Sequence, residues 1–117
     1  MTVTIYHNPA CGTSRNVLQY LRDRGFGPTV IEYLKTPPDR ATLKSLLQKM
    51  KMKPGELLRR KGDVYLSLHL DGLGVTDDQI LDAMAANPIL IERPIVVTPD
   101  GVRLCRPWVT VKELVPG

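Results

Sequence analysis

The chain has 117 residues, 43% of them apolar and 24% charged, and a formal net charge of +4. This length suits one domain with a hydrophobic core and excludes two ordinary ones. Because no apolar run nears the roughly 20 residues that cross a bilayer, and no secretory signal is visible, we expect no membrane association.

The first third of the chain predicts a β-α-β unit. Residues 2–6 alternate as a strand does, and a helix opens at Gly12 or Thr13 and ends at Gly25. Residues 29–34 are rich in β-forming side chains and predict a second strand. Because a helix connects them, we expect the two strands to be parallel.

The middle of the chain predicts helices, and we place a helical insertion at about residues 39–87. Apolar residues at helical spacing follow Asp39 and continue to Met50. Pro54 occupies the first turn of a short helix that runs through Leu58. A capping box at residues 76–79 opens another helix, which the Asn-Pro pair at 87–88 ends.

The last part of the chain returns to strands. Residues 94–98 and 102–105 predict a hairpin around a Pro-Asp-Gly turn, and residues 107–114 a short helix. The resulting order, β-α-β, helical insertion and β-β-α, predicts an α/β thioredoxin-like (glutaredoxin-like) fold in a single domain over residues 1–117. By analogy with such folds, we expect a cis bond before Pro94 that places Arg93 beside an active cysteine.

Cys11 is the residue most suited to chemistry. It stands where the first strand gives way to the first helix, and a helix N-terminus stabilises negative charge. His7 before it and Arg15 after it are expected to add positive charge. The sequence therefore predicts a thiolate at neutral pH.

The spacing after Cys11 limits what the thiol can do. Position 14 is Ser, so the Cys-x-x-Ser loop cannot close a local disulfide and an outside thiol must resolve any adduct. The Cys-x5-Arg loop of tyrosine phosphatases is excluded because position 17 is Val. The two cysteines, Cys11 and Cys105, are too few for a disulfide-stapled scaffold, and we expect a cytoplasmic protein.

Arginines provide candidate oxyanion ligands. Arg93 and Arg106 fall at strand ends, and one residue of the Arg59-Arg60 pair is a further candidate. A guanidinium offers a planar fork of five donors that suits tetrahedral oxyanions. A basic protein can also bind nucleic acid, but the chain has few aromatic side chains and no basic-aromatic alternation, so we expect no such partner.

Several motifs together resemble the glutaredoxin-dependent arsenate reductases over nearly the whole chain. The matching segments are HNPACGTSRN (7–16), LLR (57–59), TDDQ (76–79), PILIERPIVVTP (88–99) and RLCRP (103–107).

The resemblance implies a role for each matching residue. Cys11 corresponds to the nucleophile, His7 to a residue that depresses its pKa, and Ser14 to a hydrogen-bond partner of the thiolate. The catalytic arginines that would bind the oxyanion are Arg59, Arg93 and Arg106. Cys105 corresponds to a cysteine that turnover does not need.

The resemblance also implies the reaction and its partners. We expect arsenate to be reduced to arsenite, with glutathione as co-substrate and glutaredoxin as protein partner. We expect no bound cofactor and no metal, because two His and no Cys/His cluster give no ligand set. We expect a monomer.

Two other functions stay open at the level of sequence. Spx-like regulators that bind RNA polymerase share the fold but usually carry Cys-x-x-Cys. A monothiol glutaredoxin-like protein would remove glutathione from other proteins or hold an iron–sulfur cluster. Ser14 and the full arginine set favour the reductase.

Overall fold

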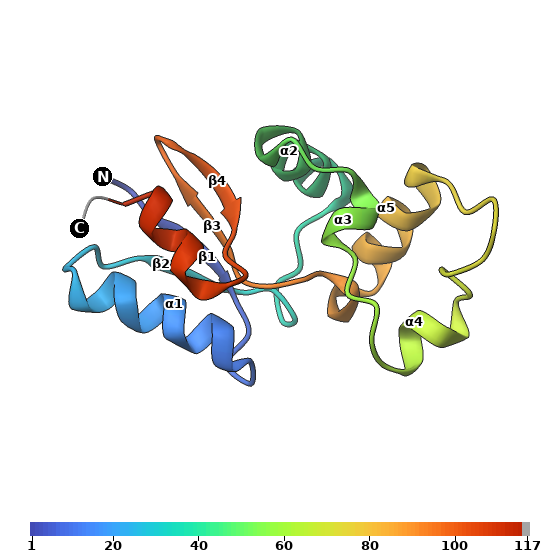
Figure 1. Cartoon of the computed structure of the whole chain (residues 1–117), viewed down its shortest axis with the longest axis horizontal. Helices are drawn as coiled ribbons and strands as arrows, with labels where there is room; N and C mark the ends of the chain where they lie inside the picture. The colour runs from blue at the N-terminus through green and yellow to red at the C-terminus, as the bar shows by residue number, and fades with distance from the viewer. Residues whose placement is uncertain (116–117) are drawn as a thin grey trace. The chain divides into compact units, whose positions relative to one another are not determined.

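The computed structural model describes residues 1–115 and divides into two compact units. One unit, here the sheet unit, contains Met1–Thr36 and the chain from Arg93 onward. The other, here the helical unit, is Pro37–Glu92 and contains the predicted helical insertion. Figure 1 shows the strands and helices of each unit.

A four-stranded sheet forms the centre of the sheet unit, in the order β2-β1-β3-β4. The strands are β1 (Thr4–His7), β2 (Thr29–Glu32), β3 (Ile95–Thr98) and β4 (Gly101–Leu104). β1 and β2 are parallel, as predicted, while β3 runs antiparallel to both β1 and β4. Figure 1 shows β3 and β4 as the predicted hairpin. This order brings the C-terminal ends of β1 and β2 and the segment before β3 to the same end of the sheet.

Two helices belong to the sheet unit, α1 (Gly12–Asp23) and the 3-10 helix η2 (Trp108–Glu113), and they contact each other. The predicted apolar stripe of α1 is buried against the sheet. The core consists of Val3, Ile5, Val17, Leu18, Leu21, Val96, Cys105, Val111, Leu114 and Val115. Burying the apolar face of each element supplies most of the stability of such a unit.

The helical unit is built around α5, which contacts α2, α3 and the 3-10 helix η1. Its elements are α2 (Arg40–Met50), α3 (Pro54–Leu57), α4 (Asp63–Ser67), α5 (Asp77–Ala86) and η1 (Pro88–Leu90). Three of these, α2, α3 and α5, were expected from capping and periodicity, and η1 begins at the proline of the Asn-Pro pair that was expected to end α5. α4 was not expected, because five residues are too short for a periodic pattern and Gly62 is typical of a helix end.

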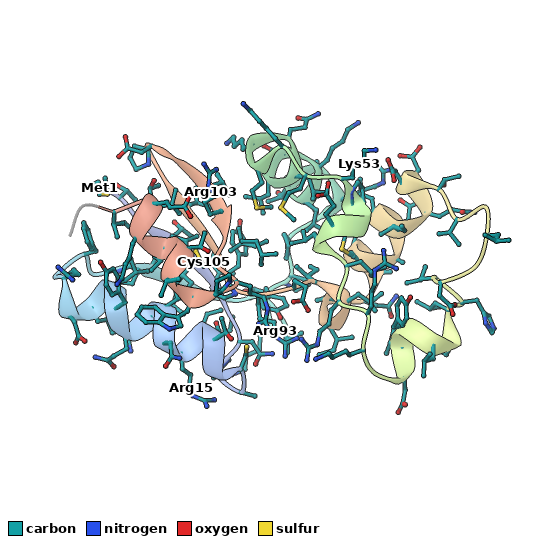
Figure 2. The ribbon with its side chains drawn as sticks, viewed as in Figure 1. Met1, Arg15, Lys53, Arg93, Arg103 and Cys105 are labelled. Atoms are coloured by element: carbon teal, nitrogen blue, oxygen red, sulfur yellow. The ribbon has the colours of Figure 1, made fainter. Side chains whose placement is uncertain are left out.

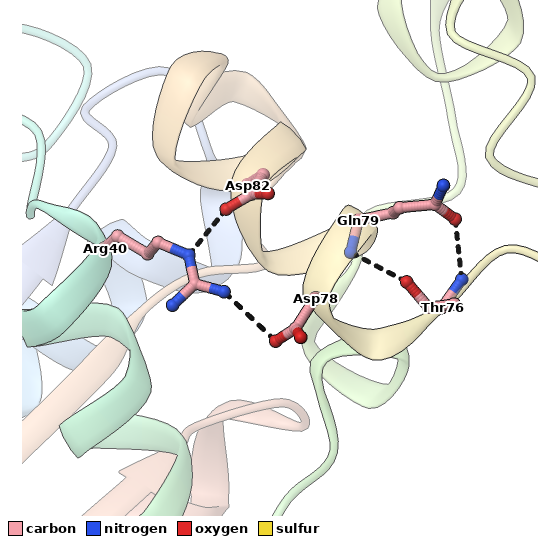
Figure 3. A network of polar contacts seen from close by, with 5 residues as sticks. All are labelled: Arg40, Thr76, Asp78, Gln79 and Asp82. Carbon is pink, nitrogen blue, oxygen red and sulfur yellow. Dashed lines mark hydrogen bonds and ion pairs between the residues drawn. The ribbon is translucent and has the colours of Figure 1, made fainter.

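Polar contacts fix the ends of α2 and α5. The carboxylate of Asp39 accepts a hydrogen bond from the Thr42 amide at the start of α2. The predicted capping box is confirmed: Thr76 and Gln79 exchange side-chain and backbone hydrogen bonds (Figure 3). Figure 3 also shows Arg40 of α2 bridging Asp78 and Asp82 of α5. These pairs are exposed, so they orient the two helices more than they stabilise them.

No helix within residues 1–115 combines the length and the apolar character needed to pass through a bilayer.

Candidate active site

The site begins where β1 ends and α1 starts. Cys11 is the N-cap of α1, with extended backbone dihedral angles, and its carbonyl accepts the first helical hydrogen bond from Arg15. The loop is held in place because the Cys11 amide donates to the Asn8 carbonyl at 3.0 Å. The side chain is 9% exposed, which leaves the sulfur a narrow access to solvent. The sequence prediction that places this thiol at a helix N-terminus is therefore confirmed.

The surroundings of Cys11 lower the pKa of its thiol from 9.0 to about 7. Burial is the largest influence and opposes ionisation, but donors around the sulfur outweigh it: the backbone N–H of Ser14, then the side chains of Arg93 and Arg106. The Cys11 side chain makes no side-chain capping hydrogen bond by strict geometric criteria. The Ser14 amide is nevertheless close enough to the sulfur to stabilise the thiolate. About half of the thiol is therefore ionised at pH 7.

Two arginines from the strand ends meet at the sulfur. Arg106 follows β4 and donates from Nη1 to Cys11 Sγ at 3.6 Å and to the Arg93 carbonyl at 3.0 Å. Arg93, labelled in Figure 2, precedes β3, is 8% exposed and also donates to the Cys11 sulfur. The Arg93–Pro94 bond is cis, as expected, and so is Arg106–Pro107. Two permanently charged groups thus face the thiol.

His7 does not contribute the positive charge that the sequence suggested. It is 5% exposed, and burial lowers the pKa of its imidazole, an effect that the nearby Arg22 and Arg15 reinforce and that Glu32 opposes. The ring is therefore mainly neutral at pH 7. The expectation that His7 adds charge beside Cys11 is wrong, because the ring at the C-terminal end of β1 is buried and burial disfavours its charged form.

Ser14 acts on the thiol through its backbone, not through its hydroxyl. The hydroxyl oxygen lies 2.6 Å from His7 Nδ1 and accepts a hydrogen bond from the Asn8 amide at 3.1 Å. The side chain, which is fully buried, therefore ties the end of β1 to the first turn of α1. Ser14 was expected to be a hydrogen-bond partner of the thiolate, and the group that fills this role is its backbone amide.

Arg15 is hydrogen-bonded to the loop that carries Cys11. Its Nη1 donates to the Pro9 carbonyl at 2.9 Å, and the side chain is exposed on α1 (Figure 2). It lines a pocket of about 240 Å³ together with His7, Pro9, Leu18, Gln19 and Arg22. The expected charge of Arg15 is present, but it acts on His7 and not directly on Cys11.

Arg59 lies in the helical unit and directly follows Leu58, which forms an isolated antiparallel bridge with Ile91. Its amide donates to the Leu90 carbonyl at 2.7 Å, and its guanidinium pairs with Glu92 at 3.1 Å. Both side chains of this pair are mostly covered, 23% and 20% exposed. The structure thus gives Arg59 a fixed position next to the segment that leads to Arg93.

Arg60 differs from its neighbour. It is exposed and donates to the Tyr65 hydroxyl at 3.3 Å and to the Gly55 carbonyl at 3.2 Å. Its guanidinium is thus held against the surface of the helical unit by neutral oxygens. The two neighbouring arginines therefore differ in exposure and in the charge of their partners.

Cys105 is buried in the core of the sheet unit with no exposed area. Burial, with a smaller contribution from Glu113, raises the pKa of its thiol to about 12. Both cysteines are free thiols. Among the residues described, no three His, Cys, Asp or Glu side chains are grouped as a metal site would require.

The ArsC family matches residues 6–114 of this chain. Among curated proteins, the chain is 50% identical to an arsenate reductase of Rhizobium meliloti over 99% of its length and 83% of the relative. It is 52% identical to an arsenate reductase of Escherichia coli K12 over 97% of its length and 81% of the relative.

Solved structures agree with the sequence relatives. An arsenate reductase from Vibrio cholerae superposes with a TM-score of 0.93 at 41% identity and covers 98% of both chains. The predicted thioredoxin-like α/β fold is thereby confirmed. With a family match over nearly all of its length and relatives at half identity, this chain is a member of the ArsC family.

Proposed function

We propose that this protein is an arsenate reductase in which the Cys11 thiolate is the nucleophile. The observation that carries the proposal is a thiol with a pKa of about 7 on which Arg93 and Arg106 converge. The close relatives named as arsenate reductases support the choice of substrate. Arsenate is a tetrahedral oxyanion, and its charge matches two guanidinium groups beside a nucleophile.

The first step is the formation of a sulfur–arsenic bond. Arg93 and Arg106 bind the arsenate oxygens, and we assign a third contact to Arg59 because the resemblance to arsenate reductases implies it. The Cys11 thiolate attacks arsenic and forms the sulfur–arsenic bond, while one arsenic–oxygen bond breaks and its oxygen leaves as hydroxide, which takes up a proton from solvent to become water; arsenic stays pentavalent. The guanidinium groups stabilise the charge that develops on the oxygens in the transition state.

The second step needs thiols from outside the chain. Neither Ser14 nor the buried Cys105 offers a thiolate, so glutathione replaces a second oxygen on arsenic and releases another water. A glutaredoxin thiolate then attacks the glutathione sulfur. The electron pair of the arsenic–sulfur bond passes to arsenic, which becomes trivalent, and a glutaredoxin–glutathione disulfide leaves. Hydrolysis frees arsenite and restores the Cys11 thiolate.

His7, Ser14 and Arg15 support this chemistry indirectly. His7 and Ser14 fix the loop so that the Ser14 amide faces the sulfur. Arg15 holds the Pro9 carbonyl on the outer side of the same loop. We propose that the protein works as a monomer in the cytoplasm, because the nucleophile, Arg93 and Arg106 all come from one sheet unit and the reaction consumes reduced thiols.

The test is arsenate-dependent oxidation of NADPH in the presence of glutathione, glutaredoxin and glutathione reductase. Cys11→Ser should lower turnover by roughly 10³-fold or more, because a hydroxyl is not ionised at neutral pH. Cys105→Ala is the matched control and should keep wild-type turnover, and alanine avoids burying a hydroxyl in the core.

An inactive wild-type protein, or equal loss in both variants, would refute the proposal. In that case, co-purification with RNA polymerase would identify an Spx-like regulator. Visible absorbance after anaerobic purification would identify a cluster-binding glutaredoxin-like protein.

A further inference from the structure

Tyr33 is a fully buried polar residue that the proposed mechanism leaves without a role. It follows β2 directly, is 1% exposed, and has the largest side chain among the fully buried residues. From the sequence it was interpreted only as a β-forming side chain. A phenolic oxygen buried this deeply needs hydrogen-bond partners.

The strand register places Tyr33 in line with the active-site loop. His7 of β1 pairs with Glu32 of the parallel β2, and Asn8 and Tyr33 are the residues that directly follow this last pair. Tyr6 pairs with Ile95 of the antiparallel β3. Asn8 follows Tyr6 by two residues, and Arg93 precedes Ile95 by two residues, so both extend from this pair of strand residues. Tyr33, Asn8 and Arg93 therefore all lie within two residues of paired strand positions at the same end of the sheet.

The side chains of Tyr33, Asn8 and Arg93 are joined by hydrogen bonds. Tyr33 is hydrogen-bonded to the side chains of Asn8 and Arg93, and both contacts favour the phenolate form, which identifies both partners as donors. Asn8 has its carbonyl oxygen Oδ1 occupied by the Ala10 amide at 2.9 Å, so its amide nitrogen is the donor to Tyr33. The phenolic oxygen thus accepts from Arg93 on one side and from the Cys11 loop on the other. Burial, the largest influence, raises the pKa of Tyr33, so the oxygen stays neutral at physiological pH.

We infer that Tyr33 is a positioning residue of the active site: its buried hydroxyl fixes the Arg93 guanidinium against the loop that carries Cys11. This role rests on the proposed function for its effect on arsenate, but not for its effect on the thiol. Arg93 has a long flexible stem, and holding it in one geometry before substrate arrives removes the entropy cost of ordering it during catalysis. Asn8 connects the Tyr33 hydroxyl to the loop: its side-chain amide donates to the hydroxyl, and its backbone carbonyl accepts from the Cys11 amide at 3.0 Å.

The test is Tyr33→Phe, which keeps the ring and removes the acceptor. We expect the rate of iodoacetamide alkylation of Cys11 at pH 6 to fall about threefold, equivalent to a rise of about 0.5 in the pKa of the thiol. The KM for arsenate should rise about fivefold while kcat stays within about twofold, because Arg93 binds substrate less well.

The matched control is Tyr65→Phe. Tyr65 is also a buried tyrosine whose hydroxyl accepts from an arginine, Arg60, but it lies in the helical unit. This variant should keep the wild-type alkylation profile. A general loss of packing would change thermal unfolding in both variants, whereas only the loss of positioning changes the pH profile of Cys11.

A double-mutant cycle separates action through Arg93 from a direct effect. In an Arg93→Ala background, Tyr33→Phe should change alkylation at pH 6 no further. Full additivity of the two changes, or a Tyr33→Phe profile that coincides with wild type, would overturn the inference. Alkylation requires no arsenate turnover, so failure of the proposed function and failure of this inference give different results.

NMR provides a second measurement in case Tyr33→Phe does not fold. Fluorotyrosine placed at position 33 keeps the shape of the side chain and weakens its oxygen as an acceptor. The side-chain N–H signals of Arg93 should then move and exchange faster with solvent. Signals that are unaffected by the fluorine would contradict the inference.

Discussion

The two cysteines of this protein have the same chemical group and opposite surroundings. Cys11 caps α1, faces the Ser14 amide and two arginines, and has a pKa of about 7. Cys105 lies among apolar side chains beyond β4, with its thiol 3.8 Å from the Arg103 carbonyl and a pKa of about 12. Both are mostly covered, at 9% and 0% exposure, so burial alone does not separate them.

The difference lies in the donors that face each sulfur. Burial raises the pKa of both thiols. At Cys11 a backbone N–H and two guanidinium groups overcome it, whereas the carbonyl beside Cys105 can only accept a hydrogen bond, which the neutral thiol donates and a thiolate could not. The reactivity of a cysteine in this fold is therefore set by the few groups within hydrogen-bond distance of its sulfur.

The largest expected effect is the difference in reactivity between the two thiols. At pH 7 about half of Cys11 is thiolate, against on the order of 10⁻⁵ of Cys105, so iodoacetamide should modify Cys11 alone. Below pH 7 the Cys11 rate should fall about tenfold per pH unit, because protonation removes the nucleophile. Mass spectrometry of alkylated protein between pH 5 and 9 checks both statements. Comparable labelling of both cysteines would remove the basis of the comparison.

Arg106→Ala should make the Cys11 site more like the Cys105 site. Loss of a charged donor should raise the pKa of the Cys11 thiol and lower kcat/KM for arsenate about 10- to 100-fold, the value of one charge-assisted hydrogen bond. Arg103→Ala is the control, because Arg103 is an exposed arginine on β4, the strand that Arg106 follows, and its Nη1 donates to the Val102 carbonyl. Steady-state kinetics and alkylation rates measure the two effects. Equal losses in the two variants would indicate a general effect of net charge.

Arg59→Ala and Arg60→Ala test whether the donor set around Cys11 extends into the helical unit. We expect about a tenfold loss of kcat/KM for Arg59→Ala and less than twofold for Arg60→Ala, because the Arg59 position is more covered and better fixed. The reverse order would identify Arg60 as the ligand. Neither change should alter the thiol pKa as much as Arg106→Ala does.

The smallest expected effect on activity is that of replacing Cys105, whose thiol is unreactive. Cys105→Ala leaves a small cavity in the core of the sheet unit and should reduce the free energy of unfolding by about 1–2 kcal/mol. Turnover should be unchanged, because the side chain contacts no group of the site. Urea unfolding and the coupled assay measure the two quantities. A fall in kcat without a fall in stability would show that the two cysteine sites are connected.

The strands and most helices could be predicted because their signals are local. Asp39, Thr76 and the apolar spacing that follows each are present in the sequence and need no tertiary contact to be recognised. α4 gave no such signal, because Asp63–Ser67 is a single short turn after a glycine with positive φ. Its position depends on tertiary packing, and the sequence does not encode that packing locally.

The site was predicted less completely than the fold. Cys11 and its arginines follow from element boundaries and resemblance, but the state of His7 depends on burial and the contact of Ser14 depends on which of its groups faces the sulfur. Tyr33 was missed because its hydroxyl can be related to the active site only when the arrangement of β1, β2 and β3 is known. The signal that could have found it is a tyrosine directly after the strand parallel to β1, at the level of the active-site loop.

The Cys-x-x-Ser loop has a consequence for the fate of this protein under oxidative stress. Peroxide attacks thiolates, and the sulfenic acid it forms is rescued when a nearby thiol converts it to a disulfide. Here position 14 offers a hydroxyl already held by His7, and Cys105 is protonated in the core. Without prompt capture by a small thiol, the oxidised sulfur proceeds to the irreversible sulfinic acid. The features that activate the thiol thus make its survival depend on the reducing capacity of the surrounding medium.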